Sequence, residues 1–140
     1  MNLTFKQKIK NVYIPPIDDK YLWDFLHEYK FSKPLYIPIT PKPLYKINNC
    51  HNNVIDYINK YGGDRVIGFY MLKEKNSNNF IGITHSVVYK NGVYLDITPV
   101  NHTYNYNIFI PTDKKELDVS RFEYFDNQIS YEFYQKQSNP

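Results

Sequence analysis

Two segments of the chain place hydrophobic residues at helical spacing. In residues 19–29, the apolar positions 21, 22, 25, 26 and 29 follow Asp18 and Asp19, and an aspartate is a good N-terminal cap. In residues 50–61, the apolar positions 54, 55 and 58 share one face, and Gly62 and Gly63 supply a left-handed stop. The pattern predicts an amphipathic helix in each segment, with Cys50 in the first turn of the second helix.

The segment between these helices is rich in proline. Residues 31–45 contain Pro34, Pro38, Pro41 and Pro43, which rules out a regular helix and argues against a central strand because each proline lacks an N–H donor. We therefore expect an extended connection that lies over the domain, anchored by its apolar residues Leu35, Tyr36, Ile37 and Ile39.

The second half of the chain has the character of an antiparallel sheet. Residues 65–73, 80–90 and 93–98 are rich in β-branched and aromatic residues, and Asn91-Gly92 is a strong hairpin signal. Residues 106–110 predict a fourth strand, and one or two edge strands are expected after Leu117, with a loose tail over 135–140. The predicted fold class is α+β, with the helix that bears Cys50 packed on the sheet and Trp23 in the core.

Length and composition limit the class of protein. The 140 residues, 42% hydrophobic and 18% aromatic, fit one domain with a substantial core and exclude a disordered chain. We expect this domain to comprise an N-terminal helix and connector over 1–47, a core over 48–134, and the tail. No apolar run reaches the roughly 18 residues of a membrane span, and lysines interrupt the first 14 residues, so we expect a soluble, cytoplasmic protein that does not bind membranes.

The charge and residue bias argue against a nucleic-acid partner. The net charge is +3, and nearly all basic residues are lysines, whereas nucleic-acid modules usually carry a denser stripe that includes arginine. The chain has no alanine and is rich in Asn, Lys, Ile and Tyr, as an AT-rich genome would encode, and such genomes include those of many large DNA viruses. This bias accounts for the 15 tyrosines without a base-stacking surface.

Cys50 is the only cysteine, which excludes an internal disulfide and any zinc site with several thiolates. No two histidines share a ligand spacing on one helix, so we expect neither a metal nor a cofactor. A lone cysteine is most often a small buried hydrophobe. At a helix start, however, the unpaired N–H groups and the helix dipole favour the thiolate, which is the nucleophilic form.

Among the four histidines, His85 is the one that the pattern pairs with a carboxylate. If Asn91-Gly92 forms a two-residue turn, Lys90 lies opposite Val93, and Asp96 comes within diagonal reach of His85 on the same face. Asp96 sits in an apolar strand, where an unpaired carboxylate would be costly, although a His and an Asp on neighbouring strands are also often a surface pair. The other three histidines are expected to face solvent (His51), to lie on the surface or in packing (His27), or remain unassigned (His102).

The segment His85-Ser86-Val87-Val88-Tyr89-Lys90-Asn91-Gly92-Val93-Tyr94-Leu95-Asp96-Ile97-Thr98-Pro99 resembles the transglutaminase-like core, in which a histidine strand, a short hairpin and an aspartate strand follow one another. More broadly, the order of Cys50, His85 and Asp96 is similar to that of papain-like enzymes. The resemblance implies a catalytic triad of a nucleophile, a base and a residue that orients the base. Papain-like enzymes also place a glutamine before the cysteine as an oxyanion donor. Residues 43–49 contain none, so Asn48 or Asn49 is the candidate donor, although helix capping explains both equally.

These observations lead to two hypotheses of different kinds. The first is a small cysteine hydrolase or acyltransferase that acts on amide or isopeptide bonds of a protein or peptide, such as a host protein, through Cys50, His85 and Asp96. The alternative is a non-catalytic protein-interaction module or virion component that retains the fold and uses its aromatic surface and proline-rich connector for binding.

Overall fold

The computed structural model describes residues 11–47, 49–100, 103–113 and 124–126. Over these residues the fold is α+β, with two helices and a seven-stranded, mostly antiparallel sheet. The elements in chain order are β1 (Val12–Tyr13), α2 (Lys20–Glu28), β2 (Leu35–Pro38), α3 (Cys50–Tyr61), β3 (Asp64–Glu74), β4 (Phe80–Lys90), β5 (Val93–Leu95), β6 (Tyr106–Pro111) and β7 (Tyr124–Asp126).

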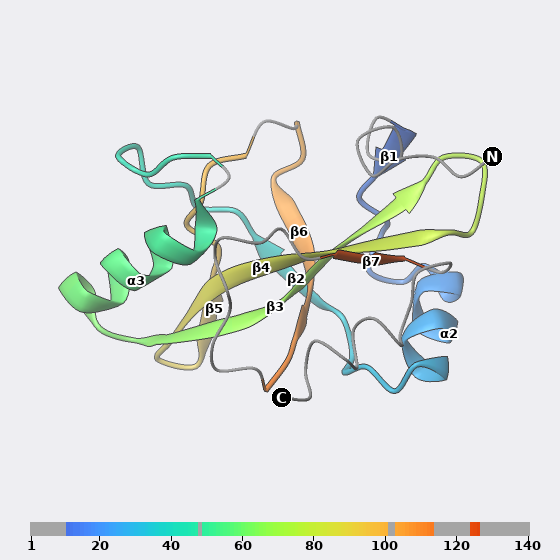
Figure 1. Ribbon diagram of the computed structural model, residues 1–140, viewed down its shortest axis with the longest axis horizontal. Coiled ribbons are helices and arrows are strands. Elements are labelled where there is room, and N and C mark those ends of the chain that lie inside the picture. The colour runs from blue at the N-terminus through green and yellow to red at the C-terminus, as the bar shows by residue number, and fades with distance from the viewer. Residues whose placement is uncertain (1–10, 48, 101–102, 114–123, 127–140) are drawn as a thin grey trace.

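The long hairpin of β3 and β4 forms the centre of the sheet (Figure 1). The strand order is β2-β6-β3-β4-β5, while β1 pairs with the end of β3 and β7 pairs with the beginning of β4. All strand pairs are antiparallel, and an isolated parallel bridge joins Ile39 to Asp96. α3 lies near one end of the hairpin and α2 near the other, so each helix covers a different part of the sheet.

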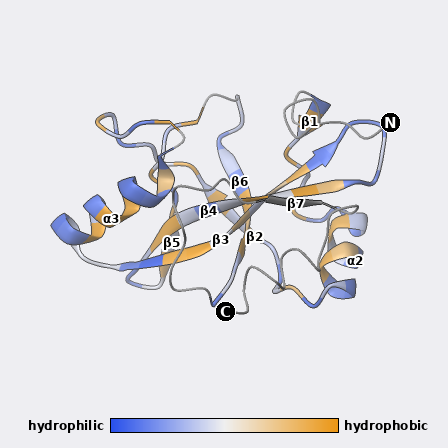
Figure 2. Cartoon of the chain, viewed as in Figure 1, coloured by the Kyte–Doolittle hydropathy of each residue, from blue (hydrophilic) through white to orange (hydrophobic). Residues whose placement is uncertain are grey.

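Both helices lie where the sequence predicts them. The Asp19 side chain accepts a hydrogen bond of 3.1 Å from the Leu22 amide and caps α2, whose Leu22, Phe25 and Leu26 are buried. α3 begins at Cys50 and ends at Tyr61, before Gly62 with a φ of 85°. Hydrophobic and hydrophilic positions alternate along both helices, as expected for amphipathic helices that pack on a sheet (Figure 2).

The core explains how α3 is held. Val54 and Tyr57 of α3 pack with Val88 of β4 and with Ile97, which confirms that the helix bearing Cys50 packs on the sheet. A larger cluster lies under α2 and includes Leu22, Phe25 and Phe69, and a third cluster joins Ile37, Val87 and Phe109.

The proline-rich segment is extended, as predicted, and contributes the edge strand β2. Pro38 is tolerated there because an edge strand leaves one row of N–H positions unpaired. The Ile37 side chain is buried and anchors the strand.

The predicted hairpin is also confirmed. Asn91 and Gly92 have φ values of 53° and 79°, and Lys90 lies opposite Val93. The third strand is shorter than the predicted 93–98, because β5 ends at Leu95. At Asp96 the chain leaves β4 and pairs with the proline-rich segment, and the Asp96 carbonyl accepts a hydrogen bond of 2.8 Å from the Thr40 amide.

One expectation about a single residue is wrong. Trp23 is 40% exposed rather than in the core, and its indole N–H donates to the Ile17 carbonyl at 2.6 Å.

Gly68 lies where β6 approaches β3 closely. A Cβ atom at Gly68 would lie 2.1 Å from the Ile110 carbonyl oxygen, so the position accommodates no side chain.

Several predictions fall on residues outside the described ranges: Asn48, His102, an edge strand near residues 129–133, and the tail 135–140. Of the expected edge strands after Leu117, β7 is described. Within the described residues, neither helix is both long and apolar enough to cross a membrane.

Candidate active site

Cys50 is the first residue of α3 and is half-buried. Asn49 occupies the N-cap position, but its side chain makes no capping hydrogen bond, and the first turn holds no acidic residue. The N–H groups of this turn have no intrahelical acceptor, and their partial positive charge favours an anion. The sequence prediction that Cys50 lies in the first helical turn is confirmed.

His85 and Asp96 form a buried pair beside this helix start. Nε2 of His85 lies 3.0 Å from each carboxylate oxygen of Asp96. The Asp96 side chain is almost fully buried and that of His85 is 6% exposed. The surface-pair alternative for these two residues is therefore wrong, and the diagonal relationship expected from the hairpin register places them within hydrogen-bond distance.

The His85 imidazole also hydrogen-bonds to the Cys50 thiol. Because Asp96 engages Nε2, Nδ1 is the ring nitrogen that remains for the sulfur. Burial by itself raises the pKa of the Cys50 thiol, but the charge of His85 and hydrogen bonds from His51 and His85 outweigh it and lower the pKa to about 5. The structure thus brings together all three residues that the sequence singled out.

The charges of the three groups support one another. Burial would lower the pKa of His85, but the negative charges of Asp96 and Cys50 raise it well above its ordinary value of 6.5. Burial would raise the pKa of Asp96, yet His85 and Asn107 lower it overall. At neutral pH the site therefore holds a thiolate, an imidazolium and a carboxylate.

Asn107 on β6 is a site residue that the sequence reasoning missed. Its side-chain amide donates to Oδ2 of Asp96 at 2.8 Å, and both side chains are buried. The available signal was a polar residue within the apolar run of β6, the same argument that singled out Asp96. Asn107 fixes the carboxylate that in turn orients His85.

The expectation that His51 faces solvent is wrong. Nδ1 of His51 hydrogen-bonds to the hydroxyl of Ser86, which is completely buried, and His51 also hydrogen-bonds to the Cys50 thiol. Neighbouring helical side chains point in different directions, but β4 lies beside the start of α3, where the side chains of both Cys50 and His51 reach it.

The position of α3 against β4 explains these contacts. Cys50 contacts His85 and His51 contacts Ser86, although neighbouring side chains of a strand point to opposite faces of the sheet. The helix start must therefore lie beside the edge of β4 rather than over one face. In the described residues, β7 pairs with β4 at 81–83 and β5 pairs with it at 88–90, which leaves this edge unpaired at 84–87.

Two aromatic rings hold the imidazole from the side. The Tyr70 ring of β3 meets the His85 ring edge-to-face with centroids 5.2 Å apart, and Phe109 of β6 lies 6.3 Å away. Burial and the nearby charges of Cys50 and Asp96 raise the pKa of Tyr70, so its hydroxyl keeps its proton. The rings restrict rotation of His85 and keep water from the His85–Asp96 pair.

The expected oxyanion donor Asn48 lies outside the described residues. Asn49, the other candidate, donates its side-chain amide to Asn53 at 3.2 Å and accepts from Asn52 at 3.1 Å. The Asn49 side chain therefore does not cap the helix, which was one of the two roles expected for it. Its amide already has two side-chain partners, which leaves it poorly placed for the other role, that of an oxyanion donor. Asn53 is structural, since it donates to the Lys46 carbonyl and the Thr98 hydroxyl and so ties α3 to two loops.

Within the described residues no cluster of three or more His, Cys, Asp or Glu side chains is placed to hold a metal ion. His27, which was expected on the surface or in packing, is exposed on α2. The arrangement is that of a thiolate with an adjacent proton donor, which suits nucleophilic attack on an acyl group.

The comparisons with known proteins leave the chemistry to be argued from the site itself. The chain matches no protein-family model, no curated protein and no solved structure.

Proposed function

We propose that this protein is a cysteine hydrolase or acyltransferase of the transglutaminase-like or papain-like kind. The observation that supports this most is the shared use of His85, whose Nε2 engages Asp96 at 3.0 Å while the ring also hydrogen-bonds to the Cys50 thiol. A structural cysteine would have no need of an imidazole held in place by a buried carboxylate. A nucleophile, a base and an orienting group in this order are the components of a triad.

The reaction begins with attack of the Cys50 thiolate on the carbonyl carbon of an amide. A C–S bond forms and the carbonyl electron pair moves to oxygen. As the C–N bond breaks, Nδ1 of the His85 imidazolium gives its proton to the leaving amine, and a thioester remains on Cys50. A water molecule, or an amine acceptor, then loses a proton to His85 and attacks the thioester, and the product acid or amide leaves with return of the thiolate.

Stabilisation of the oxyanion falls to the first turn of α3. The backbone N–H of Cys50 belongs to the set that a helix leaves without an intrahelical acceptor. Such donors act most strongly where water is excluded. His51, which contacts the thiol from the same helix, adds a second polar group beside the sulfur.

A protein or peptide is the substrate class we favour, because the thiol is half-buried at a helix start beside a strand edge that no described strand pairs with. An extended peptide segment reaches such a position without entering a deep cavity. Acyl transfer to water would make the protein a peptidase or deamidase, and transfer to an amine would make it a cross-linking enzyme.

Trapping the acyl-enzyme tests the proposal. The protein is incubated with peptide amides and with a peptidyl thioester, and the intact mass and the modified residue are read by mass spectrometry. We expect an acyl adduct on Cys50 that disappears in Cys50→Ser and decays with water or with an added primary amine. Asp96→Asn, which is nearly isosteric, should form the adduct at least tenfold more slowly. If folded wild-type protein forms the adduct no faster than the unfolded chain in denaturant, the enzyme is ruled out and the interaction-module alternative stands.

A further inference from the structure

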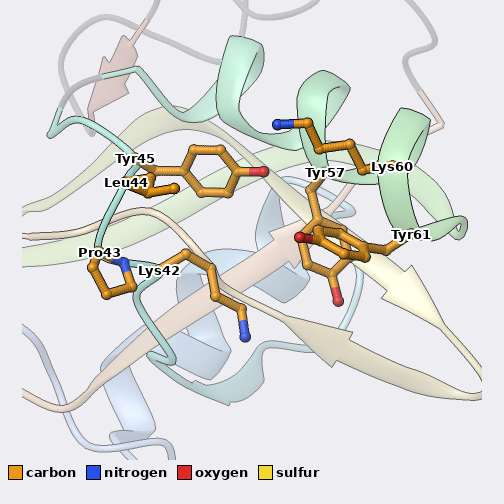
Figure 3. Close-up of a pocket in the computed structure, with 7 residues that line it drawn as sticks. All are labelled: Lys42, Pro43, Leu44, Tyr45, Tyr57, Lys60 and Tyr61. Atoms are coloured by element: carbon orange, nitrogen blue, oxygen red, sulfur yellow. The ribbon is translucent and has the colours of Figure 1, made fainter.

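A second site lies away from the thiol, between the loop of residues 42–45 and the last turns of α3. It is a pocket of about 500 Å³. Tyr45 and Lys42 extend into it from the loop, and Tyr57, Lys60 and Tyr61 line it from the helix (Figure 3). Cys50 and His85 do not line this pocket, so it is not part of the candidate active site.

The walls of the pocket are fixed by polar contacts across the two segments. The Tyr45 hydroxyl donates to Oδ2 of Asp56 at 2.8 Å, and the same carboxylate oxygen pairs with the Lys60 ammonium at 3.1 Å. Burial and the bond to Asp56 raise the pKa of Tyr45 to about 12, so the hydroxyl stays a donor. The loop and the helix are therefore tied together before any ligand arrives, which lowers the entropy cost of binding.

The floor and one side of the pocket are aromatic. Tyr57 is nearly buried and belongs to the cluster that holds α3 on the sheet. Its ring lies 4.9 Å from that of Tyr61, which is 59% exposed, and Leu44 on the loop is 93% exposed. The rings of Tyr57 and Tyr61 and the side chain of Leu44 thus form an apolar surface on which an aliphatic or aromatic anchor side chain can pack.

The charge around this surface is positive. Lys42 and Lys60 line the pocket and Lys90 lies beside the Tyr57 ring, while the carboxylate of Asp56 already binds the Tyr45 hydroxyl and the Lys60 ammonium. Lys90 donates to the Tyr61 carbonyl at 2.6 Å and lies 5.9 Å from the Tyr57 ring centroid. Among the described residues, Lys42 makes no hydrogen bond or ion pair through its ammonium group. An acidic group on the ligand complements this rim.

A nucleotide fits the pocket less well than a peptide. The pocket adjoins the C-terminal end of α3, where the unpaired backbone groups are carbonyls, whereas phosphates are often bound by the unpaired N–H groups of helix N-termini. The described residues that line the pocket include no arginine and no glycine, so they offer neither a guanidinium fork nor a phosphate-binding loop.

We propose that this pocket binds an acidic peptide segment through an aromatic or aliphatic anchor side chain that packs on Tyr57 and Tyr61, with neighbouring carboxylates on Lys42 and Lys60. Binding of this kind does not require the chemistry of Cys50. Where that proposed chemistry also operates, the helical residues of the pocket lie about 10 to 16 Å along α3 from Cys50, from a rise of 1.5 Å per residue. In that case the substrate segment bound in the pocket is separated from the reacting bond by several residues of extended chain.

The test uses the Cys50→Ser protein, so that no covalent reaction interferes, and a short fluorescein-labelled peptide with one phenylalanine flanked by aspartates. Fluorescence anisotropy is measured at low and at physiological salt. We expect saturable binding that weakens about tenfold in the double variant Lys42→Glu, Lys60→Glu and severalfold in Tyr61→Ala. Lys33→Glu, a charge reversal on a lysine outside the pocket, is the matched control and should leave binding unchanged. Circular dichroism of each variant verifies the fold.

Three results overturn the proposal: a peptide with asparagine in place of aspartate binds equally well, the double variant binds as wild type does, or adenosine monophosphate binds more tightly than the acidic peptide. The rate at which iodoacetamide labels Cys50 is measured separately in the double variant that retains the cysteine. Normal labelling with lost peptide binding separates this site from the catalytic proposal.

Discussion

Nε2 of His85 lies 3.0 Å from both carboxylate oxygens of Asp96, and the two residues come from either side of a two-residue turn. Asp96 is held in turn by the Asn107 amide at 2.8 Å. This chain of contacts leaves the imidazole little freedom to turn away from Cys50. The geometry therefore makes the reactivity of a single thiol depend on three side chains, which come from β4, from the residue after β5, and from β6.

The reactivity of Cys50 should titrate near pH 5, because the thiolate is the reactive form and the pKa of Cys50 is lowered to about 5 from 9.0. In His85→Ala, burial remains and the largest favourable charge is lost, so the midpoint should rise by several pH units. The measurement is the rate of iodoacetamide alkylation between pH 4 and 10. His27→Ala, on the exposed face of α2, is the control. A wild-type midpoint near 9 would contradict the assignment.

Removal of His51 should raise the pKa of Cys50 less than removal of His85 does. The charge of His85 acts more strongly on the thiol than either contact of His51. Ser86→Ala leaves the His51 ring in place without its hydroxyl partner, so its effect should be the smallest of the three. The same alkylation titration ranks the variants, and a larger shift in His51→Ala than in His85→Ala would show that the roles are reversed.

Asn107→Leu should slow acyl-enzyme formation by roughly tenfold to a hundredfold and destabilise the fold by about 1–3 kcal/mol. The substitution removes a buried donor to Asp96 and leaves a carboxylate oxygen with one partner fewer. Asn105→Ala, which changes an exposed residue just before β6, should change neither quantity. Adduct formation and thermal unfolding are measured in parallel, and a stability loss with an unchanged rate would confine Asn107 to a packing role.

Gly68→Ala should destabilise the protein by about 3 kcal/mol or more, because the new Cβ would lie 2.1 Å from the Ile110 carbonyl oxygen and neither backbone moves easily. Gly68 lies opposite His85, so the site is displaced together with β6. Gly62→Ala is the comparison, since nothing lies within 4 Å of its Cβ and only its φ of 85° opposes the change. Denaturant unfolding measures the stability of both variants. An equal loss of unfolding free energy in the two would refute the close approach of Ile110 as the cause.

Lys73→Met should cost about 2 kcal/mol at neutral pH, because it breaks the 2.7 Å ion pair with Asp19 on the N-terminal end of α2. Burial raises the pKa of Asp19, but Lys73 and the Leu22 amide lower it overall, below its ordinary value of 3.8. The stabilisation is therefore complete above the unfolded pKa and is lost as the pH falls through the folded one. The free energy of unfolding of wild type and variant is measured from pH 7 to pH 3. The difference between the two values should shrink only on the acid side. A constant difference would exclude the ion pair as its cause.

Much of the local structure follows from short-range signals. Asp19 before an amphipathic run, and Gly62 after one, define the ends of helices because capping groups act on the nearest turn. Asn91-Gly92 defines the hairpin register because both residues accept positive φ, and that register brings Asp96 to His85. For this reason, three of the site residues were within reach of sequence reasoning.

The remainder of the site depends on contacts between distant parts of the chain. Asn107 reaches Asp96 because β6 pairs with both β2 and β3, and no local pattern specifies that pairing. His51 reaches Ser86 because the start of α3 lies beside residues 84–87 of β4, which pair with neither β5 nor β7, and this position depends on how the helix docks. The pocket at the end of α3 likewise forms only when the loop of residues 42–45 packs against the helix.

The amino-acid order alone thus determined the two helices, the hairpin at Asn91-Gly92, and the pairing of a histidine with an aspartate, since each is decided by residues only a few positions apart. Tertiary structure decided which side chains surround that pair, the low pKa of the thiol, and the separate cationic, aromatic pocket. These depend on burial and on charges brought close by long-range packing, and burial is a property of the folded chain as a whole.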